Sequence, residues 1–212
     1  MQPASVFEET YRYYLEQIRR IDLEERARTL GAYFEQGRLE IAMFDRHYQV
    51  GPDGVFERPG RKPNFAIRVV LARYVLQCPA SPPPEGDWVT YREFRDASPL
   101  LSYFTANTNK IIESTYAGNL KGLEIACRRL GGENYRLGPE CDLTVRFCAL
   151  PRIPIGLTFN DRDESFPAQA AVLFRRSAEA FLDMECLCIL GTLLAGRLVA
   201  EAGGESKAQK AV

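Results

Sequence analysis

The stretch Leu150-Pro-Arg-Ile-Pro-Ile-Gly-Leu-Thr-Phe-Asn-Asp-Arg-Asp-Glu-Ser-Phe-Pro167 decides the fold, because the chain changes its character most sharply there. Its apolar run, residues 153–159, is typical of a buried strand. An acidic loop follows, and Phe166-Pro167 then predicts a turn into a helix over residues 168–181. We therefore expect a strand, an exposed loop and a helix in succession.

Further strands are predicted on the N-terminal side of this stretch. Residues 142–150 form its expected partner strand, and residues 39–44 and 48–56 form an earlier strand pair. Gly51-Pro52-Asp53-Gly54 is expected to supply the turn of that earlier pair, because proline presets φ and glycine accepts a positive φ. The chain therefore contains two predicted hairpins.

Helices are predicted where apolar residues recur at three- and four-residue spacing. The expected ranges are residues 6–34, 64–78, 108–130 and 184–202. Asn64 and the pair Thr90 and Glu93 have the spacing of N-terminal caps. The fold class that follows is α+β, with a small, mostly antiparallel sheet built from two strand pairs, each followed by helices, and a long N-terminal helix.

The composition favours one cytoplasmic domain. The chain has 212 residues, which suits a single α+β domain over residues 1–204, and its polar end, 205–212, is predicted to be a disordered tail. No signal peptide is visible at Met1 to Ser5, and the apolar core of helix 184–202 is expected to be too short to span a membrane. A net charge of -1 provides no basic field for nucleic acid or a membrane surface.

The cysteines and the histidine argue against metal or thiol chemistry. The six cysteines contain no Cys-x-x-Cys pair, and we expect buried, reduced thiols. His47 is the only histidine, which weakens a zinc site or a cysteine–histidine protease.

The second half of the chain resembles an uncharacterised bacterial and archaeal family, domain of unknown function 3786. The resemblance rests on residues 86–94 (Gly-Asp-Trp-Val-Thr-Tyr-Arg-Glu-Phe), 130–132, 150–155, 163–167, 172–174 and 177–178. It covers nearly the whole chain, although the first half fits more loosely. It implies a setting in anaerobic metabolism, because some relatives carry a four-cysteine iron–sulfur domain of the kind found in corrinoid proteins. This chain lacks that module, and it has Asp161 to Ser165 and Arg175 where the family pattern is expected to be more acidic.

Two candidate sites lie in or near the stretch quoted first. Asp161, Asp163 and Glu164 have oxygen ligands suited to a hard cation or another ligand, although the pattern of a calcium-binding EF-hand is missing. The alternative is a solvated acidic turn that favours the next helix. Arg175 and Arg176 are expected inside that helix, either paired with nearby acids or binding an anion.

Two more candidate sites lie in the first half. The basic loop with Arg61 and Lys62 precedes the helix at Asn64, where an anion can sit on free backbone N–H groups; the alternative is a solvated loop. Asp45 and His47 have the spacing of a general base with an orienting carboxylate, or of an ordinary turn. No nucleotide-binding or hydrolase motif accompanies any of these residues.

Three functions remain open. The first is a cytosolic, non-enzymatic accessory protein that holds a partner, such as an iron–sulfur or corrinoid protein, or an organic cofactor of the tetrapyrrole or corrinoid type. The second is an enzyme with a carboxylate and histidine site between the strand pairs, which would use Asp45 and His47, or Asp163 and Glu164, together with the basic loop. The third is a nucleic-acid module, because Val89 to Glu93 resembles the entry to a helix-turn-helix, although the net charge argues against it. The last helix is expected to be core or to pair across a homodimer.

Overall fold

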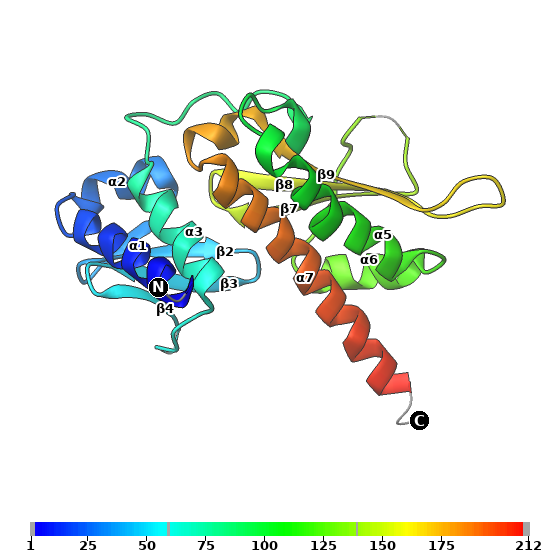
Figure 1. Cartoon of the computed structure of the whole chain (residues 1–212), viewed down its shortest axis with the longest axis horizontal. Helices are drawn as coiled ribbons and strands as arrows, with labels where there is room; N and C mark the ends of the chain where they lie inside the picture. Colours follow the sequence, from blue (N-terminus) through cyan, green and yellow to red (C-terminus); the bar gives the residue numbers. More distant parts are fainter. Residues whose placement is uncertain (1–2, 59, 139, 210–212) are drawn as a thin grey trace.

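Two antiparallel sheets organise the chain in the computed structural model (Figure 1). The structure describes residues 3–58, 60–138 and 140–209, with the side chains of residues 8–58, 60–138 and 140–203. Strands β1 to β4 form a four-stranded sheet in chain order, and β5 to β9 form a five-stranded sheet in the order β5-β9-β8-β7-β6. The α+β prediction is confirmed, but the strands form two sheets instead of one small sheet.

The N-terminal helix is interrupted, and the single long helix predicted over residues 6–34 is wrong. Helix α1 covers Pro3–Ile18 and α2 covers Leu23–Leu30. Asp22 begins α2, because its side chain accepts hydrogen bonds from the backbone N–H groups of Glu24 and Glu25. Gly31 ends α2 with a φ of 67°, as a C-terminal glycine is expected to do.

The first sheet contains two more hairpins than the sequence predicts. Its strands are β1 (Tyr33–Glu35), β2 (Arg38–Met43), β3 (Arg46–Gly51) and β4 (Gly54–Glu57). Gly51 pairs with Gly54, so Pro52 and Asp53 form the turn between β3 and β4. A separate turn at Phe44 and Asp45 joins β2 to β3. Residues 48–56 therefore form a hairpin of their own rather than one strand.

Helix α3 (Phe65–Leu76) begins at the predicted cap. The Asn64 side chain accepts a hydrogen bond from the backbone N–H of Ile67 at 2.9 Å. A proline-rich connector then leads to the edge strand β5 (Trp88–Thr90) and a single 3-10 turn at Tyr91–Glu93. The capping box of Thr90 and Glu93 is confirmed there. Tyr91 is buried and its hydroxyl donates to the Met184 carbonyl at 2.8 Å, so this segment packs into the core.

The helix predicted over residues 108–130 consists of several pieces. They are the end of a π-helical segment (Thr105–Asn109), α5 (Lys110–Tyr116) and α6 (Leu120–Arg129), and the short helix α4 (Leu101–Phe104) precedes them. Gly118 separates α5 from α6 with a φ of 79°, a conformation that glycine adopts without steric cost. Asn119 then caps α6 by accepting a hydrogen bond from the Gly122 N–H.

The second sheet corrects the largest error of the sequence analysis. Its remaining strands are β6 (Glu133–Asn134), β7 (Leu143–Leu150), β8 (Ile153–Asn160) and β9 (Gln169–Arg175). The β7–β8 hairpin is confirmed, whereas residues 169–175 form a strand between β8 and β5 instead of a helix. A 3-10 helix at Arg176–Ala180 follows it. Buried side chains on both faces of β9 hide the two-residue alternation that identifies a strand.

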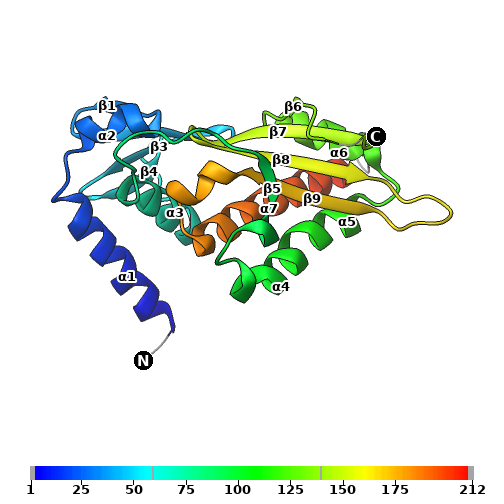
Figure 2. The same ribbon diagram turned by 90° about the horizontal axis from the view of Figure 1, so that it is seen from above.

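Helix α7 (Met184–Gln209) crosses one face of the second sheet beside α4, α5 and α6 (Figures 1 and 2). Leu187, Leu190, Leu194 and Leu198 have 0% exposure, so they belong to the core and are not available to pair across a dimer. The helix continues beyond Gly203, where it was expected to end. Residues 205–209 of the predicted tail are thus helical, and 210–212 lie outside the described residues.

Over Met184–Gly203, α7 is long and apolar enough to cross a membrane, and 44% of this window is buried inside the protein. The expectation that its apolar part is too short is therefore wrong on length and composition. The core helix of a soluble protein can have the same length and apolar composition.

The two sheets are joined through a shared core. The backbone N–H of Phe44, at the turn between β2 and β3, donates to the carbonyls of Cys148 and Ala149 in β7, both at 3.2 Å. Buried residues from both sheets and from the helices form one hydrophobic cluster. Helix α7 packs against α3 on one side and against α5 and α6 on the other, so it connects the two parts of the molecule.

Candidate functional site

The acidic residues at the tip of the β8–β9 hairpin hold the loop in shape. Asp161 Oδ1 accepts hydrogen bonds from the N–H groups of Gly118 at 2.6 Å and Arg162 at 2.7 Å. Asp163 Oδ1 accepts bonds from the N–H groups of Ser165 and Phe166, both at 2.7 Å. Glu164 is exposed. Nowhere in the described residues do three or more His, Cys, Asp or Glu side chains form a group that could hold a metal ion.

Arg175 and Arg176 lie at the other end of β9 and are not in a helix. The Arg175 guanidinium lies 4.4 Å from the centre of the Trp88 ring, donates to the Gly86 carbonyl at 3.0 Å and pairs with Glu85 at 3.3 Å. Arg176 donates to the Glu93 carbonyl at 3.3 Å. Both arginines therefore fasten the connector and β5 to the end of β9.

Asp45 and His47 have different partners. Asp45 forms an ion pair with Arg197 of α7, and its other oxygen lies 3.9 Å from Arg46 Nε. The His47 side chain is 62% exposed, and its Nδ1 lies 3.4 Å from a Glu40 carboxylate oxygen. The Asp45 carboxylate therefore pairs with arginine, and the carboxylate beside His47 is that of Glu40 instead of the predicted Asp45.

The basic loop is only partly available to a ligand. Arg58 pairs with Glu40 at 2.5 Å and Glu35 at 3.2 Å, and Arg61 forms a backbone bridge with Glu57. Lys62 is exposed and lines a small pocket beside α1. This loop follows β4, at the opposite end of the molecule from the β8–β9 hairpin tip (Figure 1). The enzyme site that combined the acidic and basic loops is therefore not assembled.

The buried thiols are unreactive. Burial raises the pKa of Cys127 to about 12 and that of Cys188 to about 11, and it also raises the pKa of Cys186. The six cysteines are free, and three of them, Cys127, Cys186 and Cys188, are buried. Neutral thiols in apolar surroundings do not act as nucleophiles, so these residues fit a packing role.

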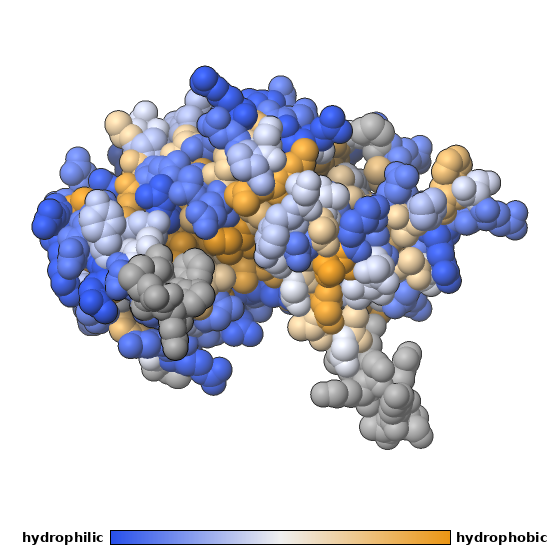
Figure 3. Space-filling model, in the orientation of Figure 1, coloured by the Kyte–Doolittle hydropathy of each residue, from blue (hydrophilic) through white to orange (hydrophobic). Residues whose placement is uncertain are grey.

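One open apolar feature is a groove along α7, which we call the α7 groove. It has a volume of about 410 Å³. Figure 3, which has the orientation of Figure 1, shows apolar surface gathered near the centre of the molecule, between α3 and the helices α4 and α5. The lining residues come from the start of α3, from α4 and from one face of α7: Asn64, Ala66, Ile67, Tyr103, Ile189, Thr192, Leu193, Gly196, Arg197 and Ala200.

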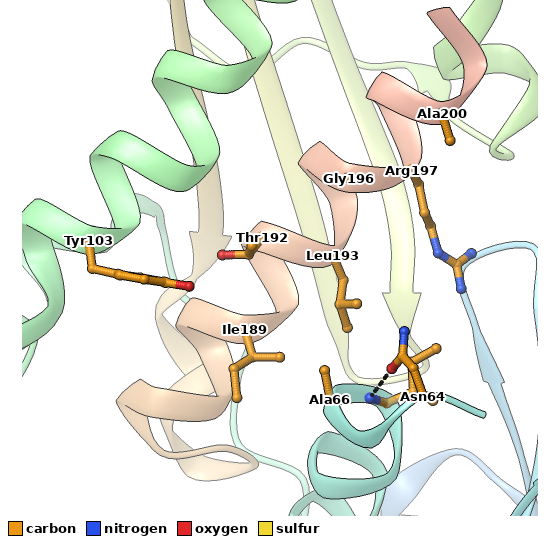
Figure 4. A pocket seen from close by; sticks show the side chains of 10 residues that line it. Asn64, Ala66, Tyr103, Ile189, Thr192, Leu193, Gly196, Arg197 and Ala200 are labelled. Carbon is orange, nitrogen blue, oxygen red and sulfur yellow. Dashed lines mark hydrogen bonds between the residues drawn. The ribbon is translucent and has the colours of Figure 1, made fainter. Parts of the chain in front are cut away.

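Polar groups stand at the edges of the α7 groove. Tyr103 reaches from α4 toward α7, and Asn64 and Arg197 stand at the other side (Figure 4). The Thr192 hydroxyl donates to the Cys188 carbonyl at 3.0 Å. The Arg197 guanidinium lies 4.8 Å from the centre of the Phe44 ring, and its side chain is only 17% exposed. Arg197 is therefore a fixed wall of the groove.

The sequence analysis missed the α7 groove, although one signal was present. Ile189, Leu193, Gly196 and Ala200 follow spacings of four, three and four residues, which places them on one face of α7. The four buried leucines lie on another face. A helix that is apolar on more than one face must have several partners, but the sequence does not show that one face stays uncovered.

A comparison with known protein families gives one match that covers most of the chain. The matching family is described as a domain of unknown function (DUF3786), and residues 22–197 match it. No curated protein and no solved structure is significantly similar to the chain. The matched region includes both sheets, α3 and most of the part of α7 that lines the groove. The chain therefore belongs to the family of the domain of unknown function DUF3786.

Proposed function

We propose that this protein is a non-enzymatic binding protein, and that the α7 groove receives an amphipathic helix of a partner protein. The observation that carries the proposal is the uncovered apolar face of α7, with Ile189 and Leu193 only half-buried while the neighbouring Leu190 and Leu194 are fully buried. Helices in grooves are recognised through apolar anchors at such three- and four-residue spacings.

The dimensions of the groove suit a short helix. From Ile189 to Ala200 the axis of α7 advances by ~16 Å, or about three turns, at ~1.5 Å per residue. Ala66, Gly196 and Ala200 are small, so the backbone of an incoming helix can approach closely. Helices pack with their axes roughly 8–10 Å apart, and small residues at the contact favour the shorter distance.

The chemistry of the lining supports binding more than catalysis. The described residues that line the α7 groove include no carboxylate, imidazole or thiol. General acid–base and nucleophilic catalysis depend mainly on those groups. The one cation, Arg197, is already paired with Asp45.

A second candidate is an organic cofactor in the same groove. Its volume of about 410 Å³ lies within the range of roughly 300–1,000 Å³ that is typical of small-ligand pockets. The polar groups of Asn64, Tyr103 and Arg197 at the edges of an apolar surface favour a ligand with a polar margin. A molecule of the tetrapyrrole or corrinoid type, suggested by the family resemblance, is the candidate of this class.

The family resemblance also suggests where the partner comes from. We include in the proposal a cytoplasmic location and a partner from anaerobic metabolism, such as an iron–sulfur or corrinoid protein. These parts of the proposal rest on the resemblance alone, whereas the α7 groove rests on geometry. Nucleic acid is a weaker choice, because the net charge of -1 supplies no general attraction for phosphate backbones.

A photoreactive amino acid at position 193 tests the proposal. Leu193 lines the α7 groove, whereas Val199 lies on the same helix, is 38% exposed and does not line it. The protein is expressed in its native host with the photoreactive residue at 193 or, as the matched control, at 199. We expect a covalent adduct from position 193 and a much weaker one from position 199, and the linked peptide should show apolar residues at helical spacing.

Two results would contradict the partner helix. Equal adducts from positions 193 and 199 would show that contact does not depend on the α7 groove. An adduct of a small organic molecule at position 193, without a linked peptide, would replace the partner helix by the organic cofactor.

A further inference from the structure

A second pocket, of about 170 Å³, lies between α1, the β3–β4 hairpin and α3. We call it the α1 pocket. Its walls differ from those of the α7 groove because charged side chains dominate them: Glu8, Arg12, Asp53, Lys62 and Arg68. No residue lines both sites, so the α1 pocket is separate from the site proposed above.

Arg68 is held rigidly in the α1 pocket. Its guanidinium carbon lies 5.0 Å from the centre of the Tyr11 ring and 5.1 Å from that of Phe65. The side chain is 18% exposed, and its Nε is buried without a hydrogen-bond partner among the described residues. The centres of these two rings lie 6.1 Å from each other, so the rings contact the guanidinium from adjacent directions and restrain it, which reduces the entropy lost on binding an anion.

Three more donors surround the same space. In the part of the chain that the structure describes, the side chains of Arg12 and Lys62 form neither a hydrogen bond nor an ion pair with another residue. The Tyr11 hydroxyl accepts a hydrogen bond from the Val55 N–H at 3.1 Å, so its own proton remains free to be donated. Burial raises the pKa of Tyr11, which keeps that proton in place at neutral pH.

The carboxylates of the α1 pocket are already neutralised. Glu8 pairs with Arg68 at 3.2 Å, and Asp53 pairs with Arg38. The lining of the pocket therefore holds three cations, Arg12, Lys62 and Arg68, against two carboxylates, so 3 − 2 leaves a formal charge of +1; Arg38, which pairs with Asp53, lies outside the lining. Guanidinium and ammonium groups around a compact space are the usual ligands of phosphate oxygens.

From this arrangement we infer that the α1 pocket binds a phosphate group, with Arg12, Lys62, Arg68 and the Tyr11 hydroxyl as its donors. The sequence predicted that an anion would sit at the helix start at Asn64, but Asn64 does not line the α1 pocket. Asn64 uses its own side chain to cap α3, and Arg58 is paired with Glu40 and Glu35, so neither contributes. Lys62 is the one predicted basic residue that takes part. The ligand is free phosphate or a phosphomonoester, which share this chemistry.

Titration at constant ionic strength tests the inference. Backbone amide shifts of the full chain are followed by NMR while inorganic phosphate, and separately glycerol 3-phosphate, is added. We expect saturable shifts at Val55 and Lys62, and a loss of affinity of ~10-fold or more in Lys62→Gln and in Arg12→Gln, as for a hydrogen bond between charged groups. Arg61→Gln removes the same charge one residue away, outside the α1 pocket, and should change the affinity by less than about 2-fold.

Saturation by both ligands assigns recognition to the phosphate group alone, and saturation by the ester alone assigns part of it to the organic moiety. The inference is wrong if neither ligand saturates the shifts by about 10 mM, the weak limit for a specific small-ligand site. It is equally wrong if Arg61→Gln weakens binding as much as Lys62→Gln, because binding would then follow the general charge of the loop.

Discussion

Arg197 ties the last helix to the first sheet. It pairs with Asp45 in the β2–β3 turn, lies over the Phe44 ring and donates to the Tyr48 hydroxyl at 3.5 Å. Because this guanidinium is mostly buried, its carboxylate partner matters more than a partner at the surface would. The pair therefore fixes one end of the α7 groove.

Removing the carboxylate tests the role of this pair. Asp45→Ala leaves Arg197 without its charged partner and should lower the free energy of unfolding by ~1–2 kcal/mol, measured by urea denaturation. His47→Ala, two residues away, changes a side chain that is 62% exposed and should cost less than about 0.5 kcal/mol. Similar losses of unfolding free energy in both variants would show that the ion pair of Asp45 and Arg197 stabilises the fold no more than an exposed side chain does.

The buried thiols predict a loss of stability at high pH. Burial raises the pKa of Cys127 to about 12, whereas a thiol in the unfolded chain ionises near ~8.5. Between these values the folded state binds the proton more tightly, so the free energy of unfolding falls as pH rises, by up to ~1.4 kcal/mol per pH unit for this thiol. Below pH ~8 this contribution is fully present.

Urea denaturation between pH 7 and 11 measures that slope. Cys127→Ala removes one titrating group, so the decline above pH ~9 should be less steep in the variant than in the wild type. Burial also raises the pKa of Tyr11 and Tyr48, and their contribution remains in both proteins. Parallel curves for the two proteins would contradict a raised pKa at Cys127.

At the scale of elements, Gly118 explains why α5 and α6 are two helices. Its φ of 79° turns the chain, its N–H donates to Asp161, and a Cβ added there would lie 2.7 Å from an Arg162 guanidinium nitrogen. The break between the helices is therefore coupled to the tip of the β8–β9 hairpin.

Two glycine substitutions separate backbone strain from that contact. Gly131→Ala places a Cβ at a φ of 75° with nothing within 4 Å, and should cost ~1 kcal/mol of stability from the backbone alone. Gly118→Ala also requires the exposed end of the Arg162 side chain to shift, so it should cost somewhat more than Gly131→Ala. Equal losses by thermal or urea denaturation would show that Arg162 simply moves aside.

Local signals were the ones that the sequence predicted well. The cap at Asn64 and the capping box of Thr90 and Glu93 each depend on a few adjacent residues, and each is confirmed. The β7–β8 hairpin was found because its apolar runs are short and separated by a proline turn. These features are set by chemistry within about four residues of each other.

Features that depend on distant neighbours were predicted poorly. Residues 170–174 form a strand only because β8 and β5 lie on either side and helices cover the face, and the same apolar run is compatible with a helix. The predicted partners Asp45 and His47 separate because Arg197, 152 residues away from Asp45, takes the carboxylate. The α7 groove combines three distant segments of chain, so no local pattern could have defined it.

At the scale of the whole molecule, α7 has two roles. Its buried leucines join the two sheets through one core, and its uncovered face forms the floor of the α7 groove. Gly196 lies on that floor, and a Cβ added there would meet nothing within 4 Å. A large side chain at this position therefore fills the groove without disturbing the fold. Gly203 lies on the same helix with equally free space, outside the groove.

The central claim, that the α7 groove holds a partner helix, is tested most directly by native mass spectrometry of the protein purified from its host under anaerobic conditions. The wild type and Gly203→Phe should carry a second polypeptide that Gly196→Phe has lost, while all three keep the same melting temperature within a few degrees. A bare chain in all three proteins would contradict the claim, as would a second polypeptide, or a second copy of this chain, that Gly196→Phe retains.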